Sequence, residues 1–238
     1  MKLKWIAFLC VAGICVLAGA CQEDTLKPVP QRVRTYLHFL NVYTGAEKID
    51  LKLNSFGENR TLVSGLASMK AWPSQGYASL LTYETDSVAP DSARLAIIDH
   101  DQRDTLVPVI GFQLSPRTKA SYILLDSVGK PLLVRTIDSI SQPDPGKAYV
   151  RFMNLCYPLR SVSLISAADD SLEISRMTFL NYSSFKRTKT GLSTFYFHND
   201  LANSRIDSLK VDIRPGKVYS FYLALTNGSP IPGVEILE

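Results

Sequence analysis

The sequence predicts an all-β protein, and three observations support this. Apolar residues recur in short runs that alternate with polar residues and are rich in β-branched and aromatic side chains. Turn signals separate these runs, and no segment keeps a helical period over 11 or more residues. An alternating sheet must cover its apolar face with a second sheet, so about seven short strands per ~100 residues indicate a β-sandwich. We therefore expect two immunoglobulin-like β-sandwiches in tandem.

The first segment, residues 1–20, reads as a secretory signal peptide. Lys2 and Lys4 precede an uncharged run that ends at Ala20. The residues Ala18-Gly19-Ala20 satisfy the small-x-small pattern of ordinary signal peptidase, which would release an unanchored protein. The alternative is cleavage directly before Cys21.

That second cut rests on a resemblance. The stretch Leu17-Ala18-Gly19-Ala20-Cys21 resembles the lipobox of bacterial lipoproteins, although its leucine lies four residues before the cysteine instead of three. The resemblance implies that Cys21 carries a lipid that anchors the protein to a membrane. More than one acyl chain would make this anchoring stable.

The residues after the cysteine refine the predicted location. Gln22, Glu23 and Asp24 resemble the acidic export tag that sends lipoproteins of Bacteroidota-type bacteria to the cell surface. This implies an outer-membrane protein on the extracellular face. We expect residues 21–32 to form the lipidated cysteine and a tether, and the alternative reading of Gln22–Asp24 is that they are only part of this solvated tether.

Charge and cysteine content narrow the function class. Removing residues 1–20 leaves 26 − 2 = 24 cationic and 22 acidic residues, a net charge of +2 that does not favour nucleic acid. Cys10 and Cys15 leave with the signal and Cys21 would be acylated, so Cys156 remains alone. Without an intramolecular disulfide, the sandwiches must be held by hydrophobic cores.

An internal repeat of roughly 100 residues divides the mature chain. The strongest break, Ser141–Gly146, carries two prolines and a glycine. We expect sandwiches over residues 33–141 and 147–238, joined by a linker over 142–146. The repeat pairs TYLHFLN (35–41) with AYVRFMN (148–154), SMKAWPSQGYASLLTYETD (68–86) with SFKRTKTGLSTFYFHND (184–200), and KASYILL (119–125) with KVYSFYL (217–223).

Strands with one buried face are clearest where apolar residues stand at every second position. Such positions are Ile49, Leu51, Leu53, Val162, Leu164, Leu209, Val211 and Ile213. Turn signals follow at residues 54–57, 115–116, 214–216 and 227–230.

Taken together, these segments resemble a family of repeated β-sandwich domains of unknown function, found in tandem in surface lipoproteins of Bacteroidota. The second repeat shows it best, in GKAYVRFMN (146–154), VSL (162–164) and RPGKVYSFYLAL (214–225). The first repeat diverges, with Arg117-Thr118-Lys119 in place of Pro-Gly-Lys. The motifs are packing motifs, so the resemblance implies a fold and a location without an activity.

Catalytic and metal-binding signatures are absent from the sequence. Its three histidines lie in unrelated segments, and no hydrolase, zinc or phosphate-binding motif occurs. Asp99-His100-Asp101, with Asp104 nearby, reads as a hairpin turn more simply than as a cation site. Cys156 reads as a small buried side chain more simply than as a nucleophile. We expect no enzyme activity, catalytic residue, metal or cofactor.

Two features are candidates for ligand binding. Trp72 lies beside a proline in an expected loop, and TFYFHN (194–199) places Tyr196 and His198 opposite Phe195 and Phe197. An exposed tryptophan or tyrosine suits a sugar ring or a protein partner. The simpler reading is one core face and one amphipathic face.

Asp followed by Ser or Thr and an apolar residue occurs at eight of the 15 aspartates, where composition alone gives roughly one. The pattern resembles the O-glycosylation signal of Bacteroidota-type envelope proteins. The implied acceptors are Thr25, Ser87, Ser92, Thr105, Ser127, Ser139, Ser171 and Ser208. An Asx or Ser/Thr turn before the next strand explains the same pattern structurally.

The sequence therefore predicts a lipid-anchored envelope protein that binds a glycan or a protein without catalysis, as an adhesion module or an accessory to glycan uptake. One alternative is a pilin-like subunit that exchanges a strand such as GVEILE (233–238). Another is a periplasmic protein of envelope assembly.

Overall fold

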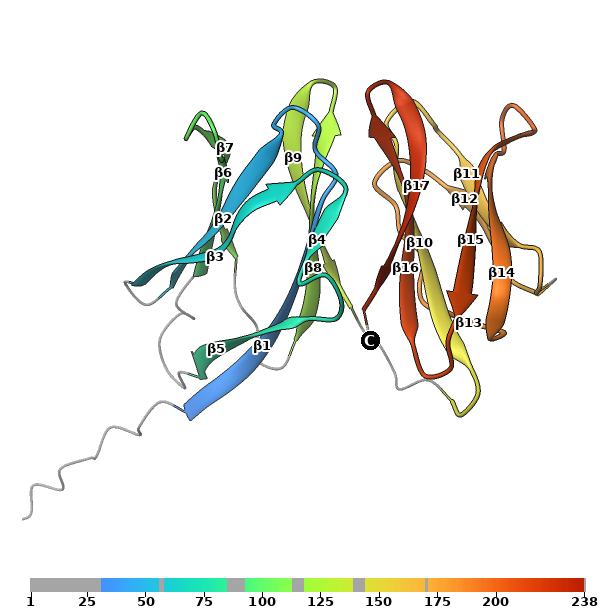
Figure 1. Cartoon of the computed structure of the whole chain (residues 1–238), viewed down its shortest axis with the longest axis horizontal. Helices are drawn as coiled ribbons and strands as arrows, with labels where there is room; N and C mark the ends of the chain where they lie inside the picture. Colours follow the sequence, from blue (N-terminus) through green and yellow to red (C-terminus); the bar gives the residue numbers. More distant parts are fainter. Residues whose placement is uncertain are drawn as a thin grey trace, which may run out of the picture. The chain divides into compact units, whose positions relative to one another are not determined.

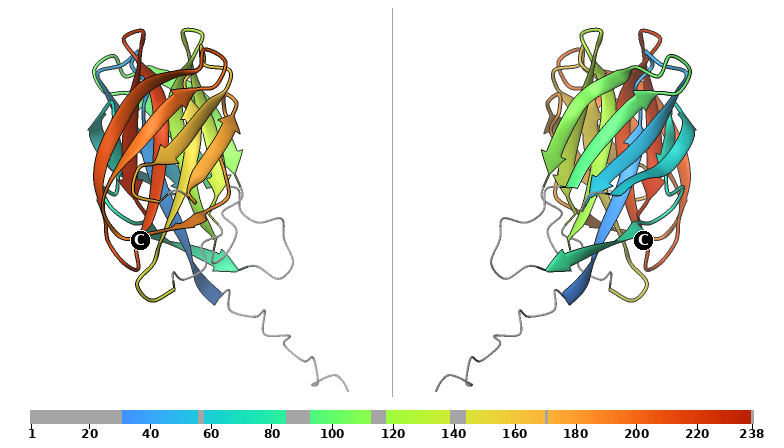
Figure 2. Two further views of the ribbon diagram at one scale, coloured as in Figure 1. Left: turned by 90° about the vertical axis from the view of Figure 1, so that its right-hand side faces the viewer. Right: turned by 90° about the vertical axis from the view of Figure 1, so that its left-hand side faces the viewer.

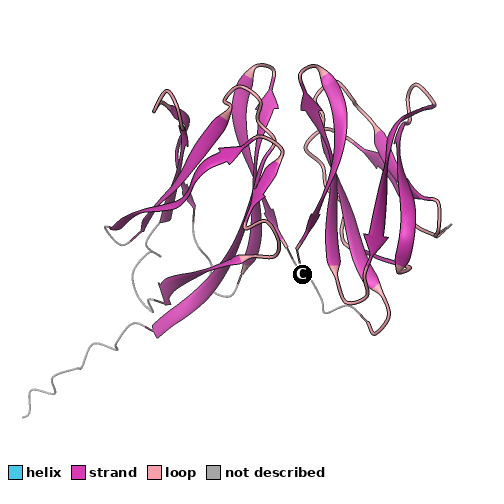
Figure 3. Ribbon diagram, in the orientation of Figure 1, coloured by secondary structure: helices cyan, strands magenta, loops and turns pink. Residues whose placement is uncertain are grey.

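The computed structural model describes residues 31–55, 58–84, 93–112, 118–138, 144–169 and 171–237. All the secondary-structure elements in these ranges are β-strands, which confirms the predicted all-β fold class (Figure 3). No helix in the described part of the chain is long and apolar enough to cross a membrane. The predicted signal peptide, Cys21, the export tag Gln22–Asp24 and Thr25 lie outside the described residues, as do residues 142–143 of the predicted linker.

The first sandwich consists of two sheets, which we call sheet A and sheet B (Figure 1). Sheet A has the order β4-β1-β8-β9, and β5 also pairs with β1. Sheet B has the order β3-β2-β6-β7. The strands are β1 (Gln31–Asn41), β2 (Lys48–Ser55), β3 (Glu58–Ala67), β4 (Lys70–Trp72), β5 (Ala78–Glu84), β6 (Ala93–Asp99), β7 (Thr105–Phe112), β8 (Lys119–Ser127) and β9 (Lys130–Ile137).

The second sandwich repeats this plan with sheets C and D. Sheet C has the order β13-β10-β16-β17, and sheet D has the order β12-β11-β14-β15. In both sandwiches the first strand pairs in parallel with a late strand, β1 with β8 and β10 with β16. The strands are β10 (Ala148–Leu155), β11 (Val162–Ser166), β12 (Glu173–Met177), β13 (Lys186–Thr188), β14 (Gly191–Asn199), β15 (Ser204–Ile213), β16 (Val218–Thr226) and β17 (Ser229–Ile236).

Each sandwich encloses its own core, formed by the alternating residues of its two sheets. Sheets A and B contribute Leu37, Phe39, Tyr122, Ile49, Leu51 and Ile97, among others. Sheets C and D contribute Val150, Phe152, Phe221, Val162, Phe195 and Phe197, among others. The alternating apolar positions of β2 and β11 point into these cores as predicted, because successive side chains of a strand leave opposite faces.

A third core lies between the two sandwiches, where sheet A packs against sheet C. It contains Leu40, Val42, Ile123, Leu125, Met153, Leu155, Tyr222 and Ala224. These residues lie on β1, β8, β10 and β16 or directly after them, so these strands are buried on both faces. The two sandwiches consequently belong to one compact unit, Arg32–Glu238.

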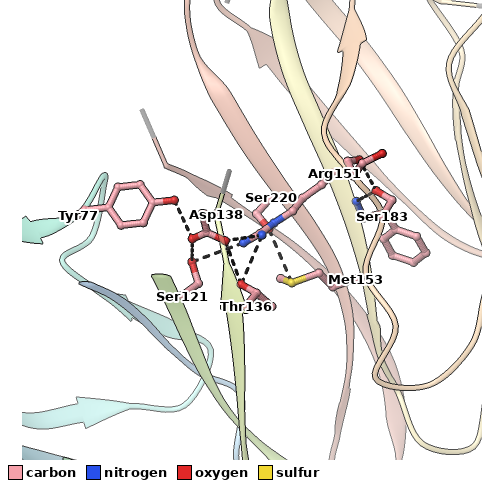
Figure 4. A network of polar contacts seen from close by, with 10 residues as sticks. Tyr77, Ser121, Thr136, Asp138, Arg151, Met153, Ser183 and Ser220 are labelled. Atoms are coloured by element: carbon pink, nitrogen blue, oxygen red, sulfur yellow. Dashed lines mark hydrogen bonds and ion pairs between the residues drawn. The ribbon is translucent and has the colours of Figure 1, made fainter. Parts of the chain in front are cut away.

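A buried ion pair crosses this contact between the sandwiches (Figure 4). Arg151 of β10 donates from Nη1 to Asp138 Oδ1 at 2.5 Å, and the side chains are 2% and 0% exposed. Asp138 follows β9 of the first sandwich and also accepts hydrogen bonds from Tyr77 and Ser121 at Oδ2. Burial, and the neighbouring Asp138 carboxylate, raise the pKa of Tyr77 above its ordinary value. The pair thus lies at the centre of a buried polar network beside the apolar core that the two sandwiches share.

Two of the predicted repeat alignments are wrong in detail. The ungapped comparison pairs Lys119 with Lys217, but the β1–β8 and β10–β16 registers equate Lys119 with Val218. A shift of one residue exchanges the two faces of a strand, and only the structural register makes Ser121 and Ser220 equivalent.

The second misalignment comes from comparing residues 68–86 with residues 184–200, which matches residues 78–84 with β14, the strand that carries Tyr196. Residues 78–84 form β5, which pairs with β1 in sheet A. The counterpart of β14 is instead β6, because each pairs with the second strand of its sandwich. Local similarity between two alternating strands does not distinguish which partner each one takes.

The shared Phe-x-Asn motif has a clear structural cause. Asn41 donates from Nδ2 to the Leu66 carbonyl and accepts from the Tyr43 amide. Asn154 donates to the Leu159 and Met177 carbonyls and accepts from the Cys156 amide. In each sandwich the asparagine lies at the last or second-last position of the first strand and ties sheet A or C to a strand of the opposite sheet.

Candidate binding surface

Sandwich one carries a polar cluster on its outer sheet, which we call the closed cluster: Asp50, Ser64, Gly65, His100 and Arg103. The Oδ1 atom of Asp50 accepts from Ser64 Oγ at 2.8 Å and from the Gly65 amide at 2.9 Å, and lies 2.7 Å from His100 Nδ1. The Oδ2 atom accepts from Arg103 Nη1 at 2.8 Å. The carboxylate is therefore enclosed by the protein's own donors.

Serine, histidine and aspartate meet in the closed cluster, yet their arrangement is not that of a catalytic triad. A triad places the imidazole between the hydroxyl and the carboxylate. Here Ser64 donates directly to Asp50, and its Oγ lies 3.4 Å from the same His100 nitrogen that contacts the carboxylate. The cluster is consequently a structural ion network.

The contribution of Asp50 to the free energy of unfolding is expected to depend on pH. Burial acts to raise the pKa of Asp50, but hydrogen bonds from His100, Ser64 and the Gly65 amide outweigh it and hold the pKa at about 2. Because the folded pKa lies below the unfolded value, the stabilisation is present above about pH 4 and is lost as the pH falls towards 2. At about 1.4 kcal/mol per pKa unit, Asp50→Asn should lose roughly 2 kcal/mol at pH 7 and depend less on acid.

Urea unfolding of the full chain between pH 2 and 7 measures this effect. The matched control is Asp212→Asn, which removes an exposed carboxylate that faces Arg214 and should change stability by less than about 0.5 kcal/mol. An Asp50→Asn variant as stable and as acid-sensitive as the wild type would contradict the prediction.

At the equivalent place in sandwich two, the outer sheet contains a hollow of about 420 Å³, which we call the open hollow. Figure 2 shows sheets D and B in front in its left and right panels, respectively. Polar side chains line the hollow: Ser163, Glu173, Ser175, Arg176, His198, Asp200 and Asn203. The predicted site residue His198 therefore lies in a surface depression.

The carboxylate of the open hollow is held by hydroxyl groups. Asp200 accepts from Ser161 at Oδ2 and from Ser163 at Oδ1, each at 2.7 Å, and His198 Nδ1 lies 3.8 Å from Oδ1. Burial acts to raise the pKa of Asp200, but these hydrogen bonds lower it below its usual value. Asp200 is thus an ionised group at the edge of a polar depression.

A second depression in sandwich two, which we call the aromatic hollow, lies between the segment after β10 and the segment after β12. It measures about 470 Å³ and is lined by Tyr157, Pro158, Arg160, Thr178 and Phe179. The Tyr157 ring is 49% exposed and meets Phe179 edge-on, with ring centroids 5.4 Å apart. Ring faces, a hydroxyl and a guanidinium converge here, which is the usual make-up of a small-ligand site.

No residue of the aromatic hollow was predicted from the sequence as a binding residue. Residues 156–160 and 178–180 meet only after β12 folds back beside β11, so no local pattern brings them together. The available signal was the Tyr157-Pro158 dipeptide directly after the Phe-x-Asn strand.

The other predicted ligand-binding residues occupy different surroundings. Trp72 ends strand β4, where it pairs with Phe39 and packs half-buried against the first core, so it does not lie in the expected loop. Phe195 and Phe197 point into the second core and Tyr196 and His198 away from it, as predicted. The Arg205 guanidinium lies over the Tyr196 ring, 5.3 Å from its centroid.

Two further expectations can be compared with the structure. Asp99 lies at the start of the predicted hairpin turn, where its Oδ1 accepts from the amides of Asp101 and Gln102. Cys156 is free and fully buried, as predicted, and burial raises the pKa of its thiol to about 11. Among the described residues no group of three His, Cys, Asp or Glu side chains could hold a metal ion.

The predicted glycosylation acceptors lie in different structural surroundings, and some lie outside the described residues. Ser87, Ser92 and Ser139 lie outside the described residues. Thr105 and Ser171 are exposed beside strand starts, and Ser127 ends β8 at a turn, where Gly129 donates to Asp126. Ser208 lies within β15, so a turn does not account for the pattern there. O-glycosylation stays a prediction at all of them.

Comparison with known proteins gives distant structural likenesses only. No family model matches the chain, and no curated protein matches it. A family 26 carbohydrate-binding module from Eubacterium rectale, solved with maltoheptaose, is 10% identical at a TM-score of 0.27, covering 84% of this chain and 96% of that one. Candidate cell adhesion proteins from Bacteroides uniformis and Bacteroides ovatus are each 8% identical, at TM-scores of 0.20 and 0.23, covering 85% and 88% of this chain and 96% and 98% of theirs. At these scores the likenesses assign neither function nor ligand to this chain.

Proposed function

We propose that this protein is a lipid-anchored cell-surface protein that binds a glycan without transforming it, and that the aromatic hollow is its binding site. The observation that carries the proposal is the half-exposed Tyr157 ring at the mouth of that hollow. A tyrosine ring offers an apolar face for a sugar ring together with a polar hydroxyl.

The surroundings of Tyr157 suit a sugar. Phe179 supports the ring edge-on, and it also packs against the core between the sandwiches, which fixes its position. Arg160 and Thr178 supply donors for sugar hydroxyl groups at the same hollow. About 470 Å³ lies within the usual range for small-molecule sites.

Binding to a glycan array, followed by calorimetry on the full chain, tests the proposal. Tyr157→Ala removes the ring and should weaken binding at least tenfold, about 1.4 kcal/mol. The matched control is Tyr182→Ala, since Tyr182 is similarly exposed at 45% but does not line the hollow, and it should bind like the wild type. Failure of the wild type to bind any glycan, or unchanged affinity in Tyr157→Ala, would overturn the proposal.

The proposed location rests on Cys21 and the acidic residues after it and has its own test. Protease treatment of intact cells should remove both sandwiches if the protein is on the outer surface. Complete protection would support the periplasmic alternative. In the pilin-like alternative, residues 233–236, which pair with β16 as part of β17, would have to leave that pairing to be exchanged between subunits.

A further inference from the structure

We infer that the open hollow is a second binding site, separate from the aromatic hollow, and that it takes a guanidinium group such as an arginine side chain. The inference rests on the internal repeat. Sandwich one bonds its cluster carboxylate with Arg103, and sandwich two has Asn203 at the equivalent position.

The two places correspond residue by residue in the strand registers. Ile49 pairs with Asp99 in sandwich one, and Val162 pairs with Asn199 in sandwich two. Asp99 and Asn199 each accept hydrogen bonds from the amides two and three residues later, so both begin the same turn. It follows that position 103 of the first turn matches position 203 of the second.

Backbone conformation supports this match. Arg103 and Asn203 both have positive φ, at 64° and 49°. On the neighbouring strand, Gly65 and Arg176 have φ of 69° and 58°. The amides of Gly65 and Arg176 donate to the side chains of Asp50 and Ser163, respectively, which are themselves equivalent positions.

What differs is the side chain at the turn. In sandwich one, Arg103 spans the cluster and bonds Asp50 Oδ2 at 2.8 Å. In sandwich two, the short Asn203 stands in its place and lines the open hollow. The carboxylate comes from Asp200, at the position of His100, while Ser163 stands at the position of Asp50 and the imidazole comes from His198 on β14.

The closed cluster and the open hollow also differ in formal charge. With histidines counted as neutral, Asp50 and Arg103 give the closed cluster a formal charge of −1 + 1 = 0. Glu173, Asp200 and Arg176 give the open hollow −2 + 1 = −1. One guanidinium entering the hollow would bring it to the same neutrality that Arg103 provides in sandwich one.

The Asp200 carboxylate has capacity for this ligand. An ionised carboxylate offers about four acceptor positions. Ser161 and Ser163 use one on each oxygen, and no Lys or Arg side chain among the described residues lies within ion-pair distance of this carboxylate. A guanidinium can bond both oxygens of a carboxylate, which an ammonium cannot do with equal geometry.

Calorimetric or NMR titration of the full chain with N-acetyl-arginine methylamide tests the inference. The matched probe is the citrulline analogue, which keeps the shape and lacks the charge. We expect saturable binding of the arginine compound and at least tenfold weaker binding of the citrulline compound. Methylguanidine serves as a third probe: affinity equal to the arginine compound indicates recognition of guanidinium alone, and weaker affinity indicates recognition of the arginine stem as well.

Variants then place the ligand in the hollow. Asn203→Arg should bond Asp200 from within and weaken binding of the arginine compound at least tenfold, because Arg103 adopts the same positive φ without difficulty. Asp200→Asn, which removes the carboxylate charge, should bind at least tenfold more weakly. Absence of saturable binding, equal affinity for the citrulline compound, or undiminished binding in Asn203→Arg would overturn the inference. Tyr157→Ala should leave arginine binding intact, so the two sites fail independently.

Discussion

Replacing Arg151 with methionine is expected to destabilise the protein by about 3–5 kcal/mol, because the change leaves a buried carboxylate without its cation. Asp138 is fully buried and would retain the hydroxyl donors of Tyr77, Ser121 and Thr136 in place of a cation. The Arg151 guanidinium also donates from Nε to Ser220 at 2.8 Å, so the variant loses a second buried contact. Urea unfolding of the full chain at pH 7 measures the loss.

A matched exposed pair provides the control for this prediction. Arg187 bonds Asp144 at 2.6 Å, with side chains 58% and 49% exposed, and Arg187→Met should cost less than about 1 kcal/mol. If Arg151→Met also costs less than 1 kcal/mol, the buried pair contributes no more than a surface pair. Because sheets A and C share a core, both sandwiches of the wild type should unfold in one transition.

Asn154→Ala is expected to cost about 2–4 kcal/mol, since several buried backbone groups lose their partner at once. The Asn154 side chain serves the carbonyls of Leu159 and Met177 and the amide of Cys156. The Cys156 amide is buried and the carbonyls of Leu159 and Met177 belong to partly buried residues, so water would replace the lost bonds only in part.

The control for Asn154→Ala is Asn181→Ala. Asn181 is exposed, and among the described residues its side chain donates only to Thr178 Oγ1, so the change should stay within about 0.5 kcal/mol. Equal stabilities of the two variants would show that the Phe-x-Asn motif is not the tie between the sheets that the hydrogen bonds indicate. Asn41→Ala tests the same tie in the first sandwich.

The alternating pattern of the sequence predicted the faces of the candidate site residues but not the residues that surround them. Alternation alone separated Phe195 and Phe197 from Tyr196 and His198, because a strand sends successive side chains to opposite faces. It could not show that His198 borders a hollow, since Ser163 and Asp200 come from other elements. Trp72 was misplaced for the same reason, because its strand is defined by pairing with β1.

The sequence by itself determined the all-β class, the strands with one buried face and the asparagine repeated at the end of each first strand. These features depend on residue types a few positions apart, and local geometry dictates them. Only the tertiary structure decided that sheets A and C face each other, that β6 is the counterpart of β14, and that Arg103 closes a cluster which Asn203 leaves open. Each of these features depends on contacts between residues that are distant in sequence. Arg151, for example, bonds both Asp138 and Ser220. Contacts of this kind produce no periodic pattern in the sequence from which they could be predicted.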